Sequence, residues 1–178
     1  ALWLAQDDPK KNTAVLASKR GDLTLHKNVR SLPKRGVILE PLCGKVFGPE
    51  DHELLTQRRG ALVGLDCSWA HIETSVESVM KRTRLQPRML PLLLAANPVN
   101  WGKPGRLTTA EALATVLYLV GRRDQAADVL GAFRWGGRFF ELNQEPLDAY
   151  ASATSSQQLV DLQFDFFDIE RPPEGDES

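Results

Sequence analysis

The chain offers two places where side chains and backbone could do chemistry together. Asp66 directly follows the apolar run Ala61–Leu65, and a carboxylate at the end of a strand can hold an ammonium group or accept a proton. The run Leu90–Ala96 leads into a loop that ends at Thr108–Glu111, a capping-box pattern that fixes a helix N-terminus. Such an N-terminus leaves backbone N–H groups for a carboxylate or a phosphate. Because ligands of parallel sheets gather beyond the carboxyl ends of the strands, we expect both places to line one crevice.

Ordinary structural roles compete with these functional interpretations. Asp66 could instead cap the next helix, and the two interpretations of its carboxylate stay open at this point. Trp69 could wall an apolar pocket, although a Trp at a helix start more often belongs to the core. In the loop, Gly102 and Gly105 permit a close approach of the backbone to a flat ligand. These residues predict a ligand crevice without naming its ligand.

Several classes of protein are disfavoured. The two cysteines, Cys43 and Cys67, are far apart and form no CxxC, which argues against a metal site and predicts a reducing compartment. The histidines form no HExxH and no catalytic triad pattern, so a nucleophilic hydrolase is disfavoured. GxGxxG and P-loop patterns are absent as well. The apolar runs are too short to span a bilayer, so we expect a soluble protein without a membrane partner.

Charge is unevenly distributed along the chain. The net charge is −1 overall, but it is +7 over residues 1–106 and −8 over residues 107–178. This pattern favours a basic face for a polyanion, although scattered solvated charge is the simpler alternative. The candidates for phosphate contacts in the basic part are Lys10, Lys11, Arg20, Arg82, Arg84, Arg88, Lys103 and Arg106.

Short apolar runs alternate with helical patterns in the first half, which predicts a parallel sheet with crossover helices. The predicted strands are Ala1–Ala5, Val37–Leu42, Ala61–Leu65 and Leu90–Ala96, with Leu23–Leu25 as a further candidate. One helix is predicted from Asp8, its N-cap, to a stop at Gly21, and a second over Ala70–Lys81.

After Thr108 the strand pattern gives way to helices. They are predicted over Ala110–Val120 with an end at Gly121, around Ala126–Phe133, and over Leu159–Ile169 with Thr154 or Ser155 as the cap. The segment Glu170–Ser178 has two prolines and no strongly apolar residue, which predicts a disordered tail. The predicted fold is α/β: a parallel-sheet domain over residues 1–89, and a mainly helical domain over residues 90–178 that completes the crevice.

Specific strings of residues carry a resemblance to a known family. They are DPKKNT at Asp8–Thr13, DCSW at Asp66–Trp69, LPLLLAANPVNWGKP at Leu90–Pro104, LTTAEA at Leu107–Ala112 and FRWGG at Phe133–Gly137, followed by Glu141–Asn143 and Leu147–Tyr150. In this order, over nearly the whole chain, they resemble the small-subunit ribosomal-RNA aminocarboxypropyltransferases of the archaeal type. Family members often carry Tyr where this chain has Trp101, which keeps the aromatic character.

The resemblance implies a fold and an activity. The fold is similar to that of the SPOUT methyltransferases, whose helical C-terminal half is threaded through the sheet as a deep trefoil knot. The activity is transfer of the 3-amino-3-carboxypropyl group of S-adenosyl-L-methionine to N3 of an N1-methylpseudouridine in small-subunit rRNA during ribosome biogenesis. The partner is then that rRNA or a pre-ribosomal subunit, and we expect a cytoplasmic monomer.

The resemblance also implies which residues do the work. The implied cofactor site consists of Thr13, Leu65, Asp66, Trp69, Leu90, Trp101, Gly105, Thr108 and Thr109. Asp66 is the implied catalytic residue; it would hold the cofactor's amino group rather than take a proton, and Trp69 would cover the methyl group. No metal is implied. The expected RNA contacts are Lys10, Lys11, Arg20, Arg82 and Lys103.

Two other functions stay open beside this one. The same knotted scaffold could transfer the methyl group instead, which would require only a different pose of the cofactor. Alternatively, the chain could be a non-catalytic RNA-binding assembly factor that uses its basic first part.

Overall fold

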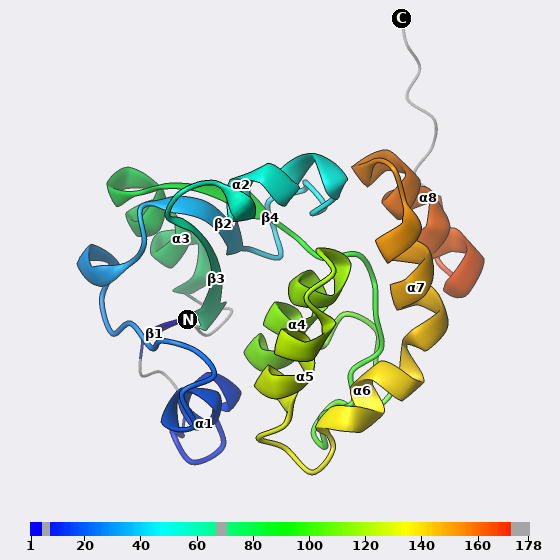
Figure 1. Cartoon of the computed structure of the whole chain (residues 1–178), viewed down its shortest axis with the longest axis horizontal. Helices are drawn as coiled ribbons and strands as arrows, with labels where there is room; N and C mark the ends of the chain where they lie inside the picture. Colours follow the sequence, from blue (N-terminus) through cyan, green and yellow to red (C-terminus); the bar gives the residue numbers. More distant parts are fainter. Residues whose placement is uncertain (5–7, 67–70, 172–178) are drawn as a thin grey trace, which may run out of the picture.

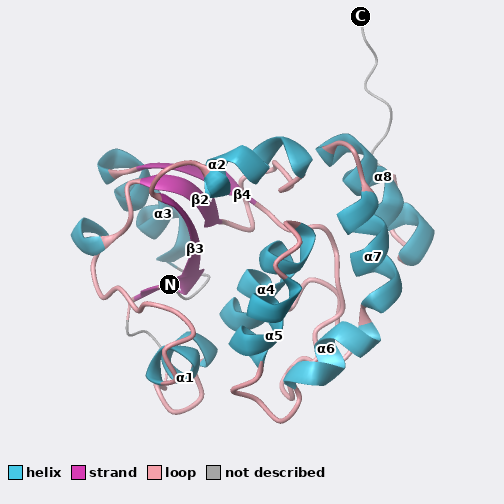
Figure 2. Ribbon diagram, in the orientation of Figure 1, coloured by secondary structure: helices cyan, strands magenta, loops and turns pink. Residues whose placement is uncertain are grey.

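The computed structural model describes residues 1–4, 8–66 and 71–171, which form four strands and eight α-helices (Figures 1 and 2). The strands are β1 Leu2–Trp3, β2 Arg35–Leu39, β3 Gly60–Asp66 and β4 Arg84–Arg88. The helices are α1 Thr13–Lys19, α2 His52–Thr56, α3 Ile72–Arg82, α4 Thr109–Leu119, α5 Arg123–Leu130, α6 Gly136–Leu142, α7 Gln144–Ser152 and α8 Ser156–Phe166, and the short 3-10 helices are η1 Val29–Ser31 and η2 Pro49–Asp51.

The four strands form one parallel sheet in the order β1-β3-β2-β4. Helix α3 makes the crossover from β3 to β4, the two strands that flank β2, and a parallel sheet requires such crossover connections. The register places Ile38 of β2 beside Val63 of β3 and beside Pro87 of β4. Pro87 is tolerated because β4 is the edge strand, where one row of N–H groups has no ladder partner. The predicted parallel sheet is confirmed.

Helices cover both faces of the sheet, because successive side chains of β2 point to opposite sides. Ile38 packs with Val63 and with Val79 of α3 on one face. Val37 and Leu39 join the larger core on the other face, where α4 and α5 lie between the sheet and the pair α7 and α8 (Figure 1). The strand β2 reads as a continuous apolar run because both of its faces are buried.

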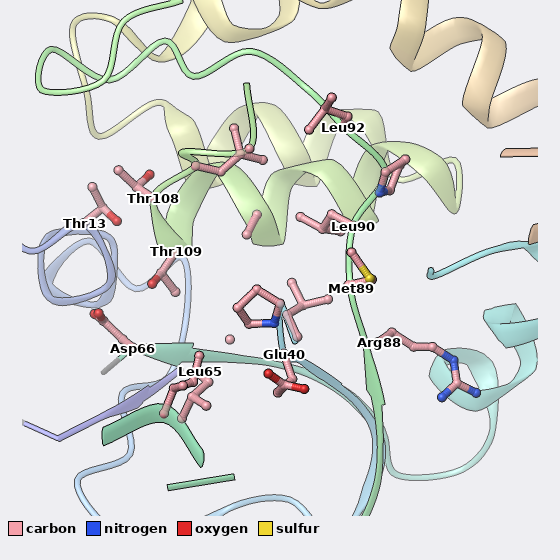
Figure 3. A pocket seen from close by; sticks show the side chains of 18 of the residues that line it. Thr13, Glu40, Leu65, Asp66, Arg88, Met89, Leu90, Leu92, Thr108 and Thr109 are labelled. Atoms are coloured by element: carbon pink, nitrogen blue, oxygen red, sulfur yellow. The ribbon is translucent and has the colours of Figure 1, made fainter. Parts of the chain in front are cut away.

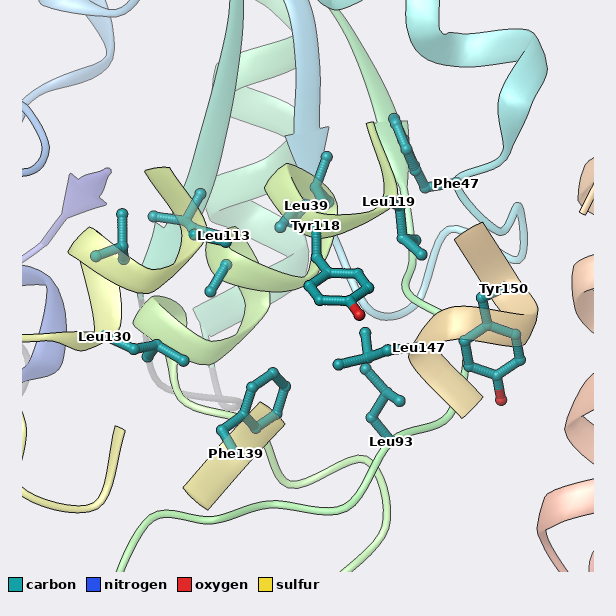
Figure 4. Close-up of a cluster of buried hydrophobic side chains, with 14 of the residues drawn as sticks. Leu39, Phe47, Leu93, Leu113, Tyr118, Leu119, Leu130, Phe139, Leu147 and Tyr150 are labelled. Carbon is teal, nitrogen blue, oxygen red and sulfur yellow. The ribbon is translucent and has the colours of Figure 1, made fainter. Parts of the chain in front are cut away.

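The larger core is built around α4, which is buried almost all round (Figure 4). Leu113 and Leu119 of this helix pack in a cluster with Phe139 of α6 and with Leu147 and Tyr150 of α7. The same cluster contains residues of the sheet. The helical half and the sheet therefore share one continuous core.

The predicted strand Leu90–Ala96 is wrong, and the structure has its fourth strand at Arg84–Arg88 instead. The run is buried, but outside the ladder it makes only an isolated bridge from Leu94 to Pro104. A run of apolar residues reports burial, and burial between helices looks the same in a sequence as burial in a sheet. Arg84–Arg88 has the sequence RLQPR, and its alternation of polar and apolar residues is the signal that would have found the strand.

Side chains from distant helices satisfy the backbone of this extended run. Asn143 accepts a hydrogen bond from the N–H of Leu94 at 2.8 Å and donates to the carbonyl of the same residue at 2.9 Å. Gln163 of α8 accepts from the N–H of Leu92 at 2.7 Å, and the Tyr150 hydroxyl donates to the Leu92 carbonyl at 2.9 Å. Burial raises the pKa of Tyr150, so this hydroxyl keeps its proton for the hydrogen bond.

The other expected elements are partly confirmed. Helix α1 begins at Thr13 rather than at Asp8, because Asp8 closes a turn by accepting from the N–H of Lys10, and Asn12 provides the cap. Leu23–Leu25 forms no strand; an isolated bridge joins His26 to Leu2.

The predicted helices are confirmed as α3, α4, α5 and α8, with Ser155 as the cap of α8. The sequence patterns do not predict the helices α2, α6 and α7, which the structure has in addition. Most of the predicted tail lies outside the described residues.

Glu111 anchors the loop before α4 through a fully buried carboxylate. One carboxylate oxygen accepts from the backbone N–H groups of Ala96 and Asn97, at 2.7 and 3.1 Å. The other accepts from the Asn97 side chain at 2.9 Å and from the N–H of Thr108 at 2.7 Å. The Thr108 hydroxyl in turn accepts from the N–H of Glu111, so the predicted capping box is confirmed and extends to the start of the loop.

We expect Glu111→Ala to lower the free energy of unfolding by about 3 kcal/mol, because it strands several buried donors that were bonded to a charged group. The measurement is urea denaturation followed by circular dichroism. Glu141→Ala, which removes an exposed carboxylate from α6, serves as the matched control and should change little. Equal effects of the two substitutions would contradict the assigned role of Glu111.

Candidate functional site

A pocket of about 510 Å³ lies at the carboxyl ends of β2, β3 and β4 (Figure 3). Its floor comes from the ends of these strands, and its sides come from the N-termini of α1 and α4 and from the extended run after β4. The lining residues are Lys11, Asn12, Thr13, Leu39, Glu40, Pro41, Gly64, Leu65, Asp66, Ile72, Arg88, Met89, Leu90, Pro91, Leu92, Gly105, Leu107, Thr108, Thr109 and Ala112. The expected crevice is therefore present at the expected edge of the sheet.

Asp66 is held at one end of the pocket by Asn12, which is itself buried. The amide of Asn12 donates to the Asp66 carboxylate, while its carbonyl oxygen caps α1 by accepting from the N–H of Val15 at 2.9 Å. One side chain thus fixes both the start of a helix and the orientation of the carboxylate. The Asp66 carboxylate lies on the side of Thr13 and Thr109 in Figure 3.

The N-termini of α1 and α4 meet beside this carboxylate. The Thr13 hydroxyl, in the first turn of α1, accepts from the N–H of Ala110 in the first turn of α4 at 3.2 Å. The N-terminal ends of helices carry partial positive charge, which stabilises anions. Within a short distance the pocket therefore offers a carboxylate for a cation and a helix terminus for an anion. This combination is complementary to the ammonium and carboxylate groups of an amino acid.

The rest of the pocket is mainly apolar. Leu65, Leu90, Leu92 and Leu107 line it, and Figure 3 shows Leu90 and Leu92 on the side away from Asp66. Such a wall suits a flat aromatic group, which is held by burial of its faces and by polar atoms of the backbone at its edge. Gly64 supports the close packing here, because a Cβ at this position would lie 2.7 Å from the Thr109 methyl group.

Two further charged residues, at the ends of β2 and β4, line the pocket, and both already have protein partners. Glu40 is buried, and its carboxylate accepts from the N–H of Leu42 at 2.7 Å. Arg88 turns its guanidinium away from the pocket, as Figure 3 shows, and binds Asp51 at 2.8 and 2.9 Å. The expectation that Arg88 is a candidate for a phosphate is therefore wrong, because a buried ion pair occupies it.

The structure brings most of the predicted cofactor site together. The members of the implied cofactor site that line this same pocket are Thr13, Leu65, Asp66, Leu90, Gly105, Thr108 and Thr109. Trp101 does not line this pocket, and it is half exposed on the loop before α4. Trp69 lies outside the described residues.

The cations that were expected to contact RNA are spread over the surface. Lys10 and Lys11 are exposed on the turn before α1, and Lys11 lines the pocket. Lys103 is exposed on the loop before α4. Arg20 pairs with Asp22 at 3.4 Å, which leaves it less available for a phosphate.

Sequence reasoning missed two polar residues of the pocket, Asn12 and Glu40. Asn12 stands directly before Thr13 in the string DPKKNT, and its capping role was given to Asp8. Glu40 stands at the end of an apolar run, as Asp66 does, and this parallel is the signal that could have found it.

Comparisons with known proteins agree over nearly the whole chain. Residues 37–167 match the family model described as "Ribosome biogenesis protein, C-terminal". The chain is 40% identical over 159 residues to the 16S rRNA aminocarboxypropyltransferase of Methanothermobacter thermautotrophicus, which covers 89% of this chain and 92% of the relative. The enzyme of the same name from Methanopyrus kandleri is 41% identical over 159 residues, with coverage of 89% and 92%. The chain belongs to the rRNA aminocarboxypropyltransferase family.

A solved structure of this family has the same fold. It is the structure of the SAM-dependent rRNA:acp-transferase Tsr3 from Vulcanisaeta distributa, with a TM-score of 0.75 and 34% identity. The superposition covers 92% of this chain and 94% of the other. The mixed α/β architecture with a parallel sheet is therefore that of the family, and the family assignment made from the sequence strings is confirmed.

Asn12 both caps α1 and holds the Asp66 carboxylate, so two substitutions can distinguish its contribution to stability from its effect on Asp66. We expect Asn12→Ala to lower the free energy of unfolding by about 1 kcal/mol through loss of the helix cap. Asn12→Asp keeps a capping oxygen but replaces the donor to Asp66 with a second carboxylate, so it should raise the pKa of Asp66.

The measurements are urea denaturation and a pH titration of the Asp66 carboxyl carbon by NMR. An unchanged Asp66 titration in the Asn12→Asp protein would show that Asn12 does not control this carboxylate.

Proposed function

We propose that the protein transfers the 3-amino-3-carboxypropyl group of S-adenosyl-L-methionine to N3 of an N1-methylpseudouridine in small-subunit rRNA. The observation that carries the proposal is the arrangement of Asp66 beside the N-termini of α1 and α4 in one pocket. Relatives named as 16S rRNA aminocarboxypropyltransferases support it. The solved neighbour is described as SAM-dependent, which supports the cofactor.

The amino-acid end of the cofactor carries an ammonium and a carboxylate, and the pocket has a partner for each. Asp66 would hold the ammonium, and the Asn12 amide keeps that carboxylate in place. Thr13 and the backbone of Thr108 and Thr109 would meet the carboxylate at the positive end of α4. Because the ammonium and the carboxylate would each be held at a fixed position, the orientation of the cofactor's aminocarboxypropyl group in the pocket would be defined.

The nucleoside end would lie in the apolar part of the pocket. Backbone atoms near Leu65 would hold the ribose, and backbone atoms near Leu90 and Gly105 would hold the adenine. A sulfonium is already a good leaving group, so the protein has to place nucleophile, carbon and sulfur in line. Trp69 is proposed to cover the methyl group, so that the methylene next to sulfur faces the entering uridine.

Asp66 acts as an anchor in this proposal. In the reaction, N3 of the base forms a bond to the methylene carbon, the carbon–sulfur bond breaks, and methylthioadenosine leaves with the electron pair. The N3 proton passes to solvent or to another base. One carboxylate that is bonded to the cofactor's ammonium is poorly placed to accept that proton as well.

The setting of the reaction is proposed in the same way. The partner is small-subunit rRNA or a pre-ribosomal subunit, with contacts from Lys11, which lines the pocket, and from the exposed Lys10 and Lys103. The protein is proposed to act in the cytoplasm as a monomer, with the helices α4–α8 covering the face that knotted methyltransferases often use for dimers. The deep trefoil knot and the division at residue 89 are proposed on the resemblance to those enzymes. In the described part of the chain, no helix is both long enough and apolar enough to span a membrane.

A pair of isotopic labels tests the reaction directly. The protein is incubated with small-subunit rRNA that carries N1-methylpseudouridine and with S-adenosylmethionine labelled either in its carboxyl carbon or in its methyl carbon. We expect only the carboxyl label to enter the rRNA, with the mass gain of an aminocarboxypropyl group. Entry of the methyl label would show a methyltransferase. Binding of rRNA without affinity for the cofactor would show an assembly factor.

The role of Asp66 is tested by isothermal titration with S-adenosylmethionine. We expect Asp66→Asn to weaken cofactor binding about tenfold to a hundredfold, because a hydrogen bond to a charged group contributes about 1.5 to 3 kcal/mol. Asp148→Asn, which alters a partly exposed carboxylate paired with Arg123 on the helical half, is the control and should bind normally. Normal binding by Asp66→Asn with a loss of turnover alone would make Asp66 a general base instead of an anchor.

A further inference from the structure

A second hollow, of about 500 Å³, lies at the opposite end of the sheet from the cofactor pocket. It is lined by Pro33, Lys34, Arg35, Arg58 and Arg59, and we call it the amino-end hollow because these residues stand before or at the starts of β2 and β3. All four cations are exposed, and none of the described residues that line the hollow is acidic. The ion pairs of the described residues do not involve these cations.

The strand register adds a fifth cation beside them. Arg35 of β2 is the Cα partner of Arg84 of β4, so the two side chains leave the same face of the sheet next to each other. On its other side Arg35 neighbours Gly60 of β3. Gly60 has no side chain that could lie between Arg35 and the other cations of the hollow. Like charges at directly opposed positions destabilise a sheet, so this arrangement costs stability unless an anion lies between them.

The backbone around the hollow is also unusual. Arg59 has a φ of 64°, in the left-handed region that a non-glycine residue occupies only at a cost. It is followed by Gly60, where a Cβ would lie 2.5 Å from the Leu54 carbonyl oxygen. Gly36, with a φ of 122°, brings β2 so near to β3 that a Cβ would lie 2.0 Å from the Ala61 carbonyl oxygen. The backbone of Arg59 is therefore held in a strained conformation at the hollow, next to a place where β2 and β3 pack closely at Gly36 and Gly60.

We propose that the amino-end hollow binds backbone phosphates of the RNA substrate, as a second anchor remote from the reacting base. Arginine binds phosphate oxygens through two N–H groups at once, and several arginines around one hollow suit a chain of phosphates. The proposal rests on the proposed function, because it takes rRNA as the substrate.

The separation of the two sites gives the anchor its purpose. β3 runs from the hollow at Gly60 to the cofactor pocket at Asp66, a distance of about 20 Å at the usual rise per residue of a strand. The RNA must then extend along the sheet, past the edge strand or the helix α3, while its target base enters the pocket. Arg82, which was expected from the sequence to contact RNA, ends α3 two residues before β4 begins and would extend this track. Contacts at two places set the orientation of the RNA, which a single pocket cannot do.

The test measures RNA binding as a function of salt. The probe is an in vitro transcript of archaeal small-subunit rRNA, and the variants are Arg35→Gln with Arg58→Gln, and Arg84→Gln alone. A protein that contacts phosphates loses affinity as salt rises, with a slope of log affinity against log salt close to the number of contacts. We expect the double variant to bind roughly tenfold more weakly at low salt, with a slope shallower by about 1 to 2, and Arg84→Gln to show a smaller change of the same kind.

The matched control is Arg122→Gln with Arg138→Gln, which removes two exposed cations from the helical half. The control should keep the salt slope of the parent, and all variants should bind S-adenosylmethionine like the parent, which shows that they are folded. Equal slopes in the double variant and the control would overturn the proposal. Tight binding of inorganic phosphate at the hollow, with RNA affinity unchanged by the substitutions, would also overturn it in favour of a free-anion site.

If the proposed function itself is wrong, the experiments give a different result from the one that overturns the phosphate anchor. In that case the unsubstituted protein fails to transfer the carboxyl label, whatever the salt slopes of the variants show.

Discussion

The geometry of the pocket depends on one buried carboxylate, that of Glu111. Its two oxygens join the beginning of the loop, at Ala96 and Asn97, to the beginning of α4, at Thr108. Gly105 and Thr109 lie within or next to the segment that these bonds close. A buried charge is tolerated only where it is fully bonded, so the loop and the helix have one arrangement in which they can meet. The positive end of α4 is thereby fixed against the end of β3.

A second set of contacts brings the first residues of the chain to the same place. Thr13 bonds to α4, and Asn12 bonds to Asp66, so α1 is tied both to the helical half and to the sheet. The pocket is consequently formed by segments that are far apart in sequence. Its polar end and its apolar end are each built on rigid elements, which is what the orientation of a reactive cofactor requires.

Elements could be predicted from the sequence where a local signal was present. The prediction failed where a segment is buried for a reason other than pairing in a sheet. The capping box at Thr108 and the stop at Gly121 come from local backbone chemistry, and the structure has both. The run Leu90–Ala96 is wrong as a strand, because the backbone of Leu92 and Leu94 bonds to side chains of α7 and α8 and to Asn143, which no local pattern reveals. The position of Asp66 at the end of a strand placed it in the pocket, whereas Trp101 shows that membership of a recognised string does not place a side chain.

The contacts of the extended run bear on how the molecule is made. The N–H of Leu92 bonds to Gln163, which is 71 residues further along the chain, and its carbonyl bonds to Tyr150, 58 residues away. A nascent chain therefore lacks these partners until the segment up to Gln163 has left the ribosomal exit tunnel. Contacts over such separations form slowly, because a long loop must close before any of them is gained. The wall of the pocket is then among the last parts of the molecule to form, and a chain that lacks α7 and α8 also lacks the partners that hold this wall in place.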